Sequence, residues 1–441
     1  MLGISIGIYV GILLTFTHAY KNYDGYKLME VNFEEERVKR HIQDIDKHLG
    51  FMPDFLGENW KSKQAHFFLD GESVDKMRDN LDANNITYTL RDMNPSTFKS
   101  RKRRNTNNIV NINDINTRYL SYDEQIQFIN SMARQYPDMI KLQTLGNSYE
   151  GRPLISVRIG DDNKNKPIVW IDAGIHAREW ISYNVALYLI YTIATNPYYR
   201  PLLSSVRLVV VPNTNPDGYE YSRLTERMWR KTRSRYSSSR CAGADANRNY
   251  PFFWGTQGVS HNPCNEIYCG TRSQSEPEIL ALTSAIEREE TRIKGYVALH
   301  SYGQEILYPW GHTTNSYPSD VADLKRVGNL MAAAIKALNN TDYNVINSGD
   351  GLYPAAGASD DWAKSRGVKY SYTMELSPID DYTGFSLPED RIYQVNREAF
   401  EALITLTREV SREFGTRQPA TSTHFVQKFR AVSRARGFGR G

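Results

Sequence analysis

Cysteine, long apolar runs and an excess of charge of one sign are all scarce in this chain of 441 residues. Three cysteines are too few for a fold built on disulfides, although they allow one bridge and leave one thiol over. The formal net charge is only +4, and six basic residues lie beyond Arg412, so the rest of the chain is close to neutral. A nearly neutral body lacks the electrostatic surface that nucleic acids require, so we expect no nucleic-acid partner.

A long apolar run occurs only at the N-terminus and stops after about 16 residues. A membrane-spanning helix needs about 20 apolar residues, and no basic flank precedes this run, so we expect no membrane segment. Residues 17–19, Thr-His-Ala, offer a small-residue cleavage pattern, which predicts a signal peptide over residues 1–19. A membrane anchor is the alternative. In a secreted protein, the sequons Asn85-Ile86-Thr87 and Asn339-Asn340-Thr341 would be candidate glycosylation sites.

Residues 20–94 alternate short extended segments with helical ones. Extended patterns cover 28–31, 66–69 and 86–90, and apolar residues recur at helical spacing over 38–49 and 74–81. These patterns predict a small α+β unit.

The small unit is followed by a basic cluster in an Asn-rich stretch, residues 95–113, which contains Arg101, Lys102, Arg103 and Arg104. This composition is typical of an exposed linker. A solvated run of charge is one interpretation. Between a small and a large unit of a secreted protein, however, such a cluster predicts a site of proteolytic processing.

The large unit, residues 114–412, alternates predicted strands with amphipathic helices. Strands are predicted over 167–172, 206–211, 295–299 and 369–374, and helices over 122–134, 182–195, 276–289, 319–338 and 391–414. This alternation is typical of an α/β sheet covered on both faces. Residues 413–441 form a basic tail, which we expect to be disordered.

Polar side chains follow each of the four predicted strands, in the order His176 and Glu179, Asn213 and Asn215, His300, and Glu375. Ligands of open α/β sheets bind outside the carboxyl ends of strands, so we expect these side chains to converge. His176 and Glu179 are three residues apart, so a helical turn would place both on one face. With His300 they supply two nitrogens and a carboxylate, which leaves the fourth zinc position open, as in catalytic sites.

Five ordered motifs resemble the metallocarboxypeptidases of the pancreatic A/B type. They are His176-x-x-Glu179, Met228-Trp229-Arg230-Lys231-Thr232-Arg233, Asp245-Ala246-Asn247-Arg248-Asn249, His300-Ser301-Tyr302 and Thr373-Met374-Glu375-Leu376. The resemblance spans about residues 115–412, and the 75 or so residues before it resemble the propeptide domain of that family. It implies a mixed central sheet covered by helices on both faces, preceded by a small α+β ferredoxin-like propeptide domain.

The resemblance also implies hydrolysis of the C-terminal peptide bond by an enzyme with one Zn²⁺, bound by His176, Glu179 and His300. Glu375 would be the general base, which takes a proton from water and delivers it to the leaving amine. Arg230 would stabilise the developing oxyanion. The residues implied to bind the substrate are Arg178, Asn247, Arg248, Tyr302 and Tyr353.

Asp360 is the position that the resemblance links to specificity. It matches the base of the pocket for the departing side chain, which is acidic in B-type enzymes and apolar in A-type ones. We therefore expect a preference for C-terminal Lys and Arg, with A-type specificity for apolar residues as the alternative. Asp361 does not discriminate between the types, and the same pocket is expected to be lined by Gly311, Ser348 and Asp350.

The cysteines follow the family pattern in part. The resemblance implies a bridge between Cys241 and Cys264 and a free thiol at Cys269, although Cys241 could instead pair with Cys269. By chain-entropy arguments, a bridge between Cys241 and Cys264, which would close a loop of about 24 residues, would contribute about 3 kcal/mol to stability.

We therefore predict a secreted, inactive precursor in which residues 20–94 inhibit the catalytic domain. Its partners would be peptides or proteins with free C-termini and an activating protease, and we expect a monomer. A peptide-binding homologue without catalysis is one alternative, but no ligand, base or oxyanion residue is missing. A zinc amidohydrolase is another, but it would not need Asn247, Arg248 and Tyr353 together.

Overall fold

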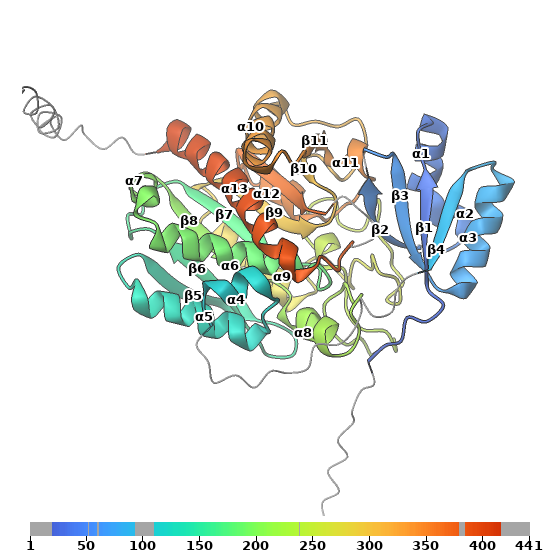
Figure 1. The fold of residues 1–441 in the computed structure, drawn as a ribbon, viewed down its shortest axis with the longest axis horizontal. Helices are drawn as coiled ribbons and strands as arrows, with labels where there is room; N and C mark the ends of the chain where they lie inside the picture. Colours follow the sequence, from blue (N-terminus) through green and yellow to red (C-terminus); the bar gives the residue numbers. More distant parts are fainter. Residues whose placement is uncertain are drawn as a thin grey trace, which may run out of the picture.

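The structure is a computed structural model that describes residues 20–51, 53–59, 61–92, 110–237, 239–378 and 384–415. The predicted signal peptide, the basic cluster from Arg101 to Arg104 and the tail beyond residue 415 lie outside the described residues. Figure 1 shows a small N-terminal unit at the right and a large unit at the left. In the part of the chain that the structure describes, no helix combines the length and the apolar character needed to cross a membrane.

The N-terminal unit is an antiparallel sheet of four strands in the order β2-β3-β1-β4. Its elements are β1 (Lys27–Asn32), α1 (Glu36–Gln43), α2 (Ile45–Leu49), β2 (Asp54–Asn59), β3 (Gln64–Leu69), α3 (Gly71–Ala83) and β4 (Tyr88–Asp92). Alternate apolar residues of β1 and β3 pack against the helices, for example Val31 and Phe67 against Met77. This order of strands and helices is the ferredoxin-like arrangement expected from the sequence.

The large unit is built on an eight-stranded mixed sheet in the order β11-β10-β12-β9-β7-β8-β6-β5. Its strands are β5 (Ile140–Asn147), β6 (Pro153–Ile159), β7 (Ile168–Ala173), β8 (Arg207–Val211), β9 (Ile293–Ser301), β10 (Glu305–Tyr308), β11 (Asn344–Asn347) and β12 (Tyr370–Leu376). The four predicted strands are the four central ones, β12, β9, β7 and β8, which run parallel. Fully buried parallel strands carry continuous apolar runs, which is why their sequences stand out.

Helices cover both faces of this sheet, so the predicted fold class is confirmed. They are α4 (Ile112–Thr117), α5 (Tyr122–Gln135), α6 (Trp180–Thr195), α7 (Arg200–Leu203), α8 (Pro216–Leu224), α9 (Pro277–Glu287), α10 (Val321–Asn339), α11 (Ser348–Gly351), α12 (Ser359–Ser365) and α13 (Ile392–Phe414). Helices α5, α6, α10 and α13 share one apolar core, whereas α9 and α12 share the core on the opposite face. Side chains of β7 alternate between the two, with Ile171 in the first and Trp170 in the second.

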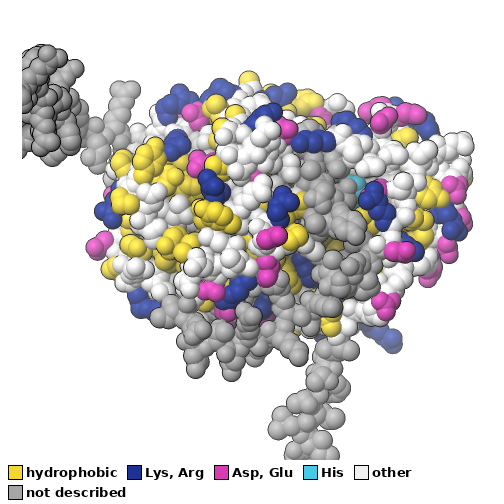
Figure 2. Space-filling view, in the orientation of Figure 1, with side chains coloured by type: hydrophobic (Ala, Val, Ile, Leu, Met, Phe, Trp, Pro, Cys, Tyr) yellow, Lys and Arg dark blue, Asp and Glu magenta, His cyan; other side chains and the backbone are white. Residues whose placement is uncertain are grey.

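The sheet brings polar residues to its carboxyl edge. His300 on β9 lies opposite Glu375 on β12, so both side chains lie on the same face of the sheet. After β7 the chain turns at Gly174, which has a φ of +75°. A Cβ there would lie 2.1 Å from the Tyr183 ring, so glycine is needed for the turn that leads to His176. On the face seen in Figure 2, acidic and basic side chains are interspersed, in line with the low net charge.

Candidate active site

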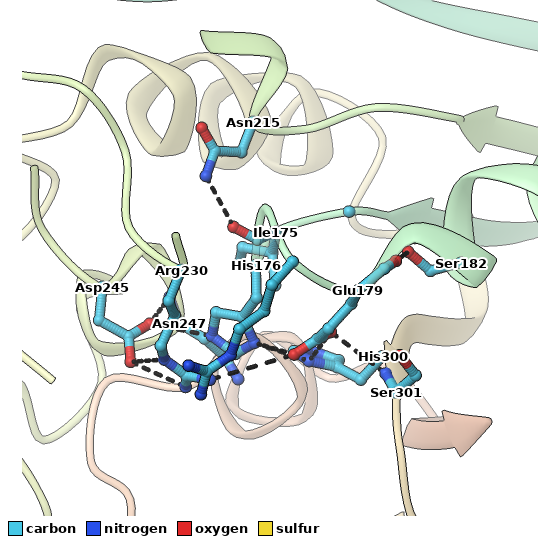
Figure 3. A network of polar contacts seen from close by, with 12 residues as sticks. Ile175, His176, Glu179, Ser182, Asn215, Arg230, Asp245, Asn247, His300 and Ser301 are labelled. Carbon is cyan, nitrogen blue, oxygen red and sulfur yellow. Dashed lines mark hydrogen bonds and ion pairs between the residues drawn. The ribbon is translucent and has the colours of Figure 1, made fainter. Parts of the chain in front are cut away.

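Three buried side chains, His176, Glu179 and His300, point toward one another at the edge of the sheet (Figure 3). His176 Nδ1 lies 2.7 Å from Glu179 Oε1, and His300 Nδ1 lies 3.1 Å from Glu179 Oε2. The two Nδ1 atoms are 3.1 Å apart. His176 and Glu179 lie in a turn before α6, in which the Glu179 amide donates to the His176 carbonyl at 3.3 Å.

These donors fit a zinc ion. Zinc bonds to nitrogen and oxygen of about 2.0–2.2 Å in a tetrahedral site separate two ligand atoms by about 3.3 Å, close to the spacings found here. Glu179 stands at the N-cap position of α6, yet its side chain does not cap the helix and is directed to the two histidines instead. Burial and the Arg230 guanidinium lower the pKa of His176, which favours the neutral imidazole that binds metals.

Asp245 connects His176 to Arg230, a contact that the sequence analysis did not predict. Its Oδ1 accepts hydrogen bonds from His176 Nε2 at 3.0 Å and from the Asn247 amide at 2.8 Å. Its Oδ2 accepts from Arg230 Nε at 3.1 Å and from Nη2 at 3.0 Å. A carboxylate only accepts, so a neutral His176 that bound a metal through Nδ1 would carry its proton on Nε2, toward Asp245. Asp245 belongs to a motif that the sequence analysis quoted, but the sequence does not reveal its partners.

Glu375 lines the same cavity as the three ligands and Arg230. Burial raises the pKa of Glu375 to about 8, the Glu179 and Glu305 carboxyl groups act in the same direction, and His300 opposes them. A carboxyl group with such a pKa can accept and return a proton near neutral pH. This position and environment suit a general base.

Another wall of the cavity carries Asn247, Arg248 and Tyr353. Arg248 is buried, and its guanidinium donates to the carbonyls of Gly258 at 2.8 Å and Asn247 at 2.9 Å, and to the Tyr353 hydroxyl at 3.2 Å. Among the described residues, the carboxylate nearest to Arg248 is that of Asp245, at 3.9 Å. The Asn247 side-chain oxygen accepts from the Ser359 amide at 2.9 Å, which fixes this side chain in the wall. A buried guanidinium without a close carboxylate is suited to bind one from a ligand.

Asp360 also lines the cavity and is 3% exposed. Its carboxylate lies 3.4 Å from Ser348 Oγ and also accepts hydrogen bonds from the backbone of Asp360 and Asp361. Asp361, in contrast, accepts three hydrogen bonds, from the amides of Gly311 and His312 and from His312 Nδ1. Asp361 therefore fixes the loop that contains Gly311 and His312, whereas Asp360 lines the cavity.

Two of the three other residues expected in this pocket are found there. Gly311 and Ser348 line the cavity, and a Cβ on Gly311 would lie 3.0 Å from the Ser348 Cβ, so glycine keeps this wall open. The expectation for Asp350 is wrong. Its side chain accepts hydrogen bonds from the Asn315 amide and the Tyr317 hydroxyl, and Asp350 is not among the residues that line the cavity.

The asparagines after β8 do not converge on the site, contrary to expectation. Asn213 donates to Gln125 at 3.1 Å. Asn215 caps α8 and donates to the carbonyls of Ile175 and Lys231, each at 3.1 Å. Asn215 thus ties together the two loops that carry His176 and Arg230, as Figure 3 shows for Ile175.

Tyr302 lines the cavity, whereas Arg178 is not among the lining residues and donates to Asp54 of the N-terminal unit. The Tyr302 ring packs edge-on against Phe385 at 5.0 Å, and the Arg178 guanidinium lies 4.5 Å from the same Phe385 ring. The loop that follows Arg230 is tied by a disulfide between Cys241 and Cys264, and Cys269 is a free, buried thiol.

Strand β2 is the strand of the N-terminal unit nearest the large unit in Figure 1, and two of its residues line this cavity. Phe55 and Leu56 line the cavity, and the Phe55 ring packs edge-on against Tyr353 at 5.3 Å. Both carboxylate oxygens of Asp54 accept from Arg178 Nη1, at 2.8 and 2.9 Å. The N-terminal unit therefore occupies space that any ligand entering from this side would need.

Comparison with known proteins identifies this arrangement. The sequence profile of the zinc carboxypeptidase family matches residues 125–402. The chain is 41% identical to carboxypeptidase B of Astacus astacus over 65% of its own length and 95% of that protein. It is 36% identical to carboxypeptidase B2 of Homo sapiens, over 80% and 85% of the two chains. The crystal structure of carboxypeptidase A from Helicoverpa armigera superposes with a TM-score of 0.79 at 25% identity, covering 89% of this chain and 98% of that one. A buried His₂Glu donor set with a matching profile, sequence and fold shows that this chain belongs to the zinc carboxypeptidase family.

Proposed function

We propose that this protein is the secreted precursor of a zinc carboxypeptidase that removes Lys and Arg from the C-termini of peptides. The observation that supports this specificity is Asp360, a buried carboxyl group at the wall of a cavity that also contains the zinc-binding residues. In this proposal residues 20–94 are an inhibitory propeptide, and a protease activates the enzyme at Arg101 to Arg104. The sequons at Asn85 and Asn339 are proposed glycosylation sites, and both asparagines are exposed.

The chemistry follows from the positions of the side chains. His176, Glu179 and His300 would hold Zn²⁺, which when bound would supply Lewis-acid chemistry toward water and a carbonyl group. The Glu375 carboxylate takes the proton of the attacking water and returns it to the leaving amine. Arg230, held by Asp245, donates to the oxygen on which negative charge develops. Arg248 and Asn247 bind the terminal carboxylate after Tyr353 moves from the Arg248 guanidinium.

The enzyme is expected to cleave peptides that end in Arg or Lys with a kcat/KM about 10² times that for otherwise identical peptides ending in Phe or Leu. A buried carboxylate left without a cationic partner costs roughly 3–5 kcal/mol, so an apolar side chain opposite Asp360 is disfavoured. The measurement is kcat/KM of the processed enzyme on peptides ending in Arg, Lys, Phe, Leu or Glu. The Asp360→Ile variant should reverse the preference.

The pH dependence of this preference tests the same carboxyl group. Burial and the Asp361 carboxylate raise the pKa of Asp360 to about 7. Only the ionised form pairs with a cation, so the ratio of kcat/KM for Arg over Phe peptides should rise as pH increases through this value. A preference for Phe or Leu at every pH would overturn the B-type assignment and leave the carboxypeptidase activity intact.

The propeptide role is supported by three sets of contacts over the cavity. Phe55 packs on Tyr353, and Asp54 pairs with Arg178. Tyr23 adds a third, because its hydroxyl accepts a hydrogen bond from the Met228 amide at 3.0 Å, two residues before Arg230. A peptide could reach the zinc site from this side only after these contacts break.

The intact precursor with Asp54→Asn is expected to hydrolyse peptides about tenfold faster than the intact wild-type precursor. A hydrogen bond to a charged group contributes roughly 1.5–3 kcal/mol, so its loss loosens the propeptide. Asp92→Asn is the matched control, because Asp92 lies on β4, the sheet edge opposite β2, and pairs with Lys27 of β1. If the wild-type precursor, verified as uncut after the assay, were as active as the processed enzyme, the inhibitory role would be wrong.

A further inference from the structure

Glu305 is a carboxyl group of the active-site cavity that the proposed mechanism does not use. It is 2% exposed and lines the cavity from β10. The register of three neighbouring strands places Glu305 opposite Glu375, and Glu375 opposite His300. Paired residues on adjacent strands share a face of the sheet. His300, Glu375 and Glu305 therefore form one row across three neighbouring strands, on the same face of the sheet.

This row marks where Glu305 lies along the substrate. On β12, Ser371 contacts the Asp360 carbonyl at 2.7 Å, and Thr373 and Glu375 follow on the same face. The direction from Ser371 to Glu375 therefore runs from the pocket of the terminal side chain to the reacting bond. Leu307 of β10 lies opposite Thr373, beside the pocket, whereas Glu305 is level with the reacting bond. Beyond Glu305 lies the space covered by the N-terminal unit.

The cations that act on Glu305 come from the N-terminal unit. They are Lys39 and Lys63, and the Glu305 side chain also interacts with Asn344 on β11. Lys39 also contacts the large unit directly, because its ammonium group donates to the Asp350 carbonyl. Among the described residues, the large unit forms no ion pair with Glu305. Departure of the N-terminal unit would therefore leave this carboxyl group at the cleft without a cation.

We propose that Glu305 selects a cationic side chain at the penultimate position of the peptide, the residue on the other side of the bond that is cleaved. The inference rests on the proposed carboxypeptidase precursor, in which Lys39 and Lys63 take the place of a substrate cation. Burial raises the pKa of Glu305 to about 8, while Asn344 and the two lysines act in the opposite direction. A substrate ammonium group would favour the ionised carboxylate for the same reason.

The experiment compares the processed enzyme on peptides that share the terminal residue and carry Lys, acetyl-lysine, Leu or Glu before it. Wild-type kcat/KM is expected to be about tenfold or more higher for Lys than for acetyl-lysine or Glu, the size expected for one charge-assisted contact. Glu305→Gln and Glu305→Leu should bring the ratio of Lys over Glu close to one. Glu290→Gln is the matched control, because Glu290 pairs with Arg366 on the surface and should keep the wild-type ratio.

Acetyl-lysine keeps the aliphatic chain of lysine, removes its charge and adds an acetyl group, and the Leu peptide is the smaller uncharged comparison, so the wild-type series needs no variant. Equal rates for Lys and acetyl-lysine would overturn the proposal, as would an unchanged ratio in a Glu305→Gln enzyme with normal zinc content and thermal transition. The terminal residue stays constant in each series. If Asp360 does not select Arg, the series is run on peptides ending in the residue that the enzyme does prefer, so the two proposals fail separately.

Discussion

Replacing Glu375 with Gln is expected to lower kcat by about 10³–10⁴ while the enzyme keeps its zinc. The amide preserves the shape of the side chain but cannot accept the proton of the attacking water, and positioned general bases contribute up to about 10⁴ in rate. Glu375 is not one of the three metal-binding residues, so zinc content should stay at one per chain. The measurement is kcat, together with zinc content by atomic absorption.

Glu278→Gln is the matched control for this change. Glu278 is also a buried carboxyl group, and burial raises its pKa to about 8, but it contacts the Tyr149 amide outside the cavity. Its replacement should leave kcat nearly unchanged. A zinc-loaded Glu375→Gln enzyme with near-normal turnover would remove Glu375 from the mechanism.

Replacing Arg230 with Gln is expected to lower kcat by about 10²–10³ with little change in KM. A donor aimed at the developing oxyanion acts mainly in the transition state, and loss of one such donor costs roughly 3–4 kcal/mol. Asp245 holds the guanidinium through two hydrogen bonds, so the donor is fixed before substrate binds. Steady-state kinetics on one peptide substrate separate the two constants.

The neighbouring Arg233 provides the control for this prediction. It is a buried arginine of the same segment, but its guanidinium packs on Tyr221 at 3.5 Å and Trp229 at 4.4 Å, away from the cavity. Arg233→Gln should affect thermal stability more than kcat. A rise in KM with constant kcat in Arg230→Gln would show that Arg230 binds the ground state instead of stabilising the transition state.

The parts of the fold that could be predicted from the sequence are those with a strong local pattern. The central strands are continuous apolar runs, and α5 and α10 carry apolar residues at helical spacing, so both signals lie within a short window. Strand β2 was not predicted. Half of its six residues are charged or amide residues, so it lacks a continuous apolar run, and a register shift beside Gly57 interrupts its pairing with β3. Yet β2 is the element that lies against the active site.

The sequence by itself determined the types of the metal-binding residues and the order of the motifs that place this chain in its family. It did not determine which polar residues meet. Asn215 follows a central strand but ties two loops together, whereas Asp245, in a loop, contacts both His176 and Arg230. Only the register of β10 against β12 places Glu305 beside Glu375. The physical reason is that local patterns record the burial of each residue within its own element, while strand register and loop contacts depend on residues far apart in the chain.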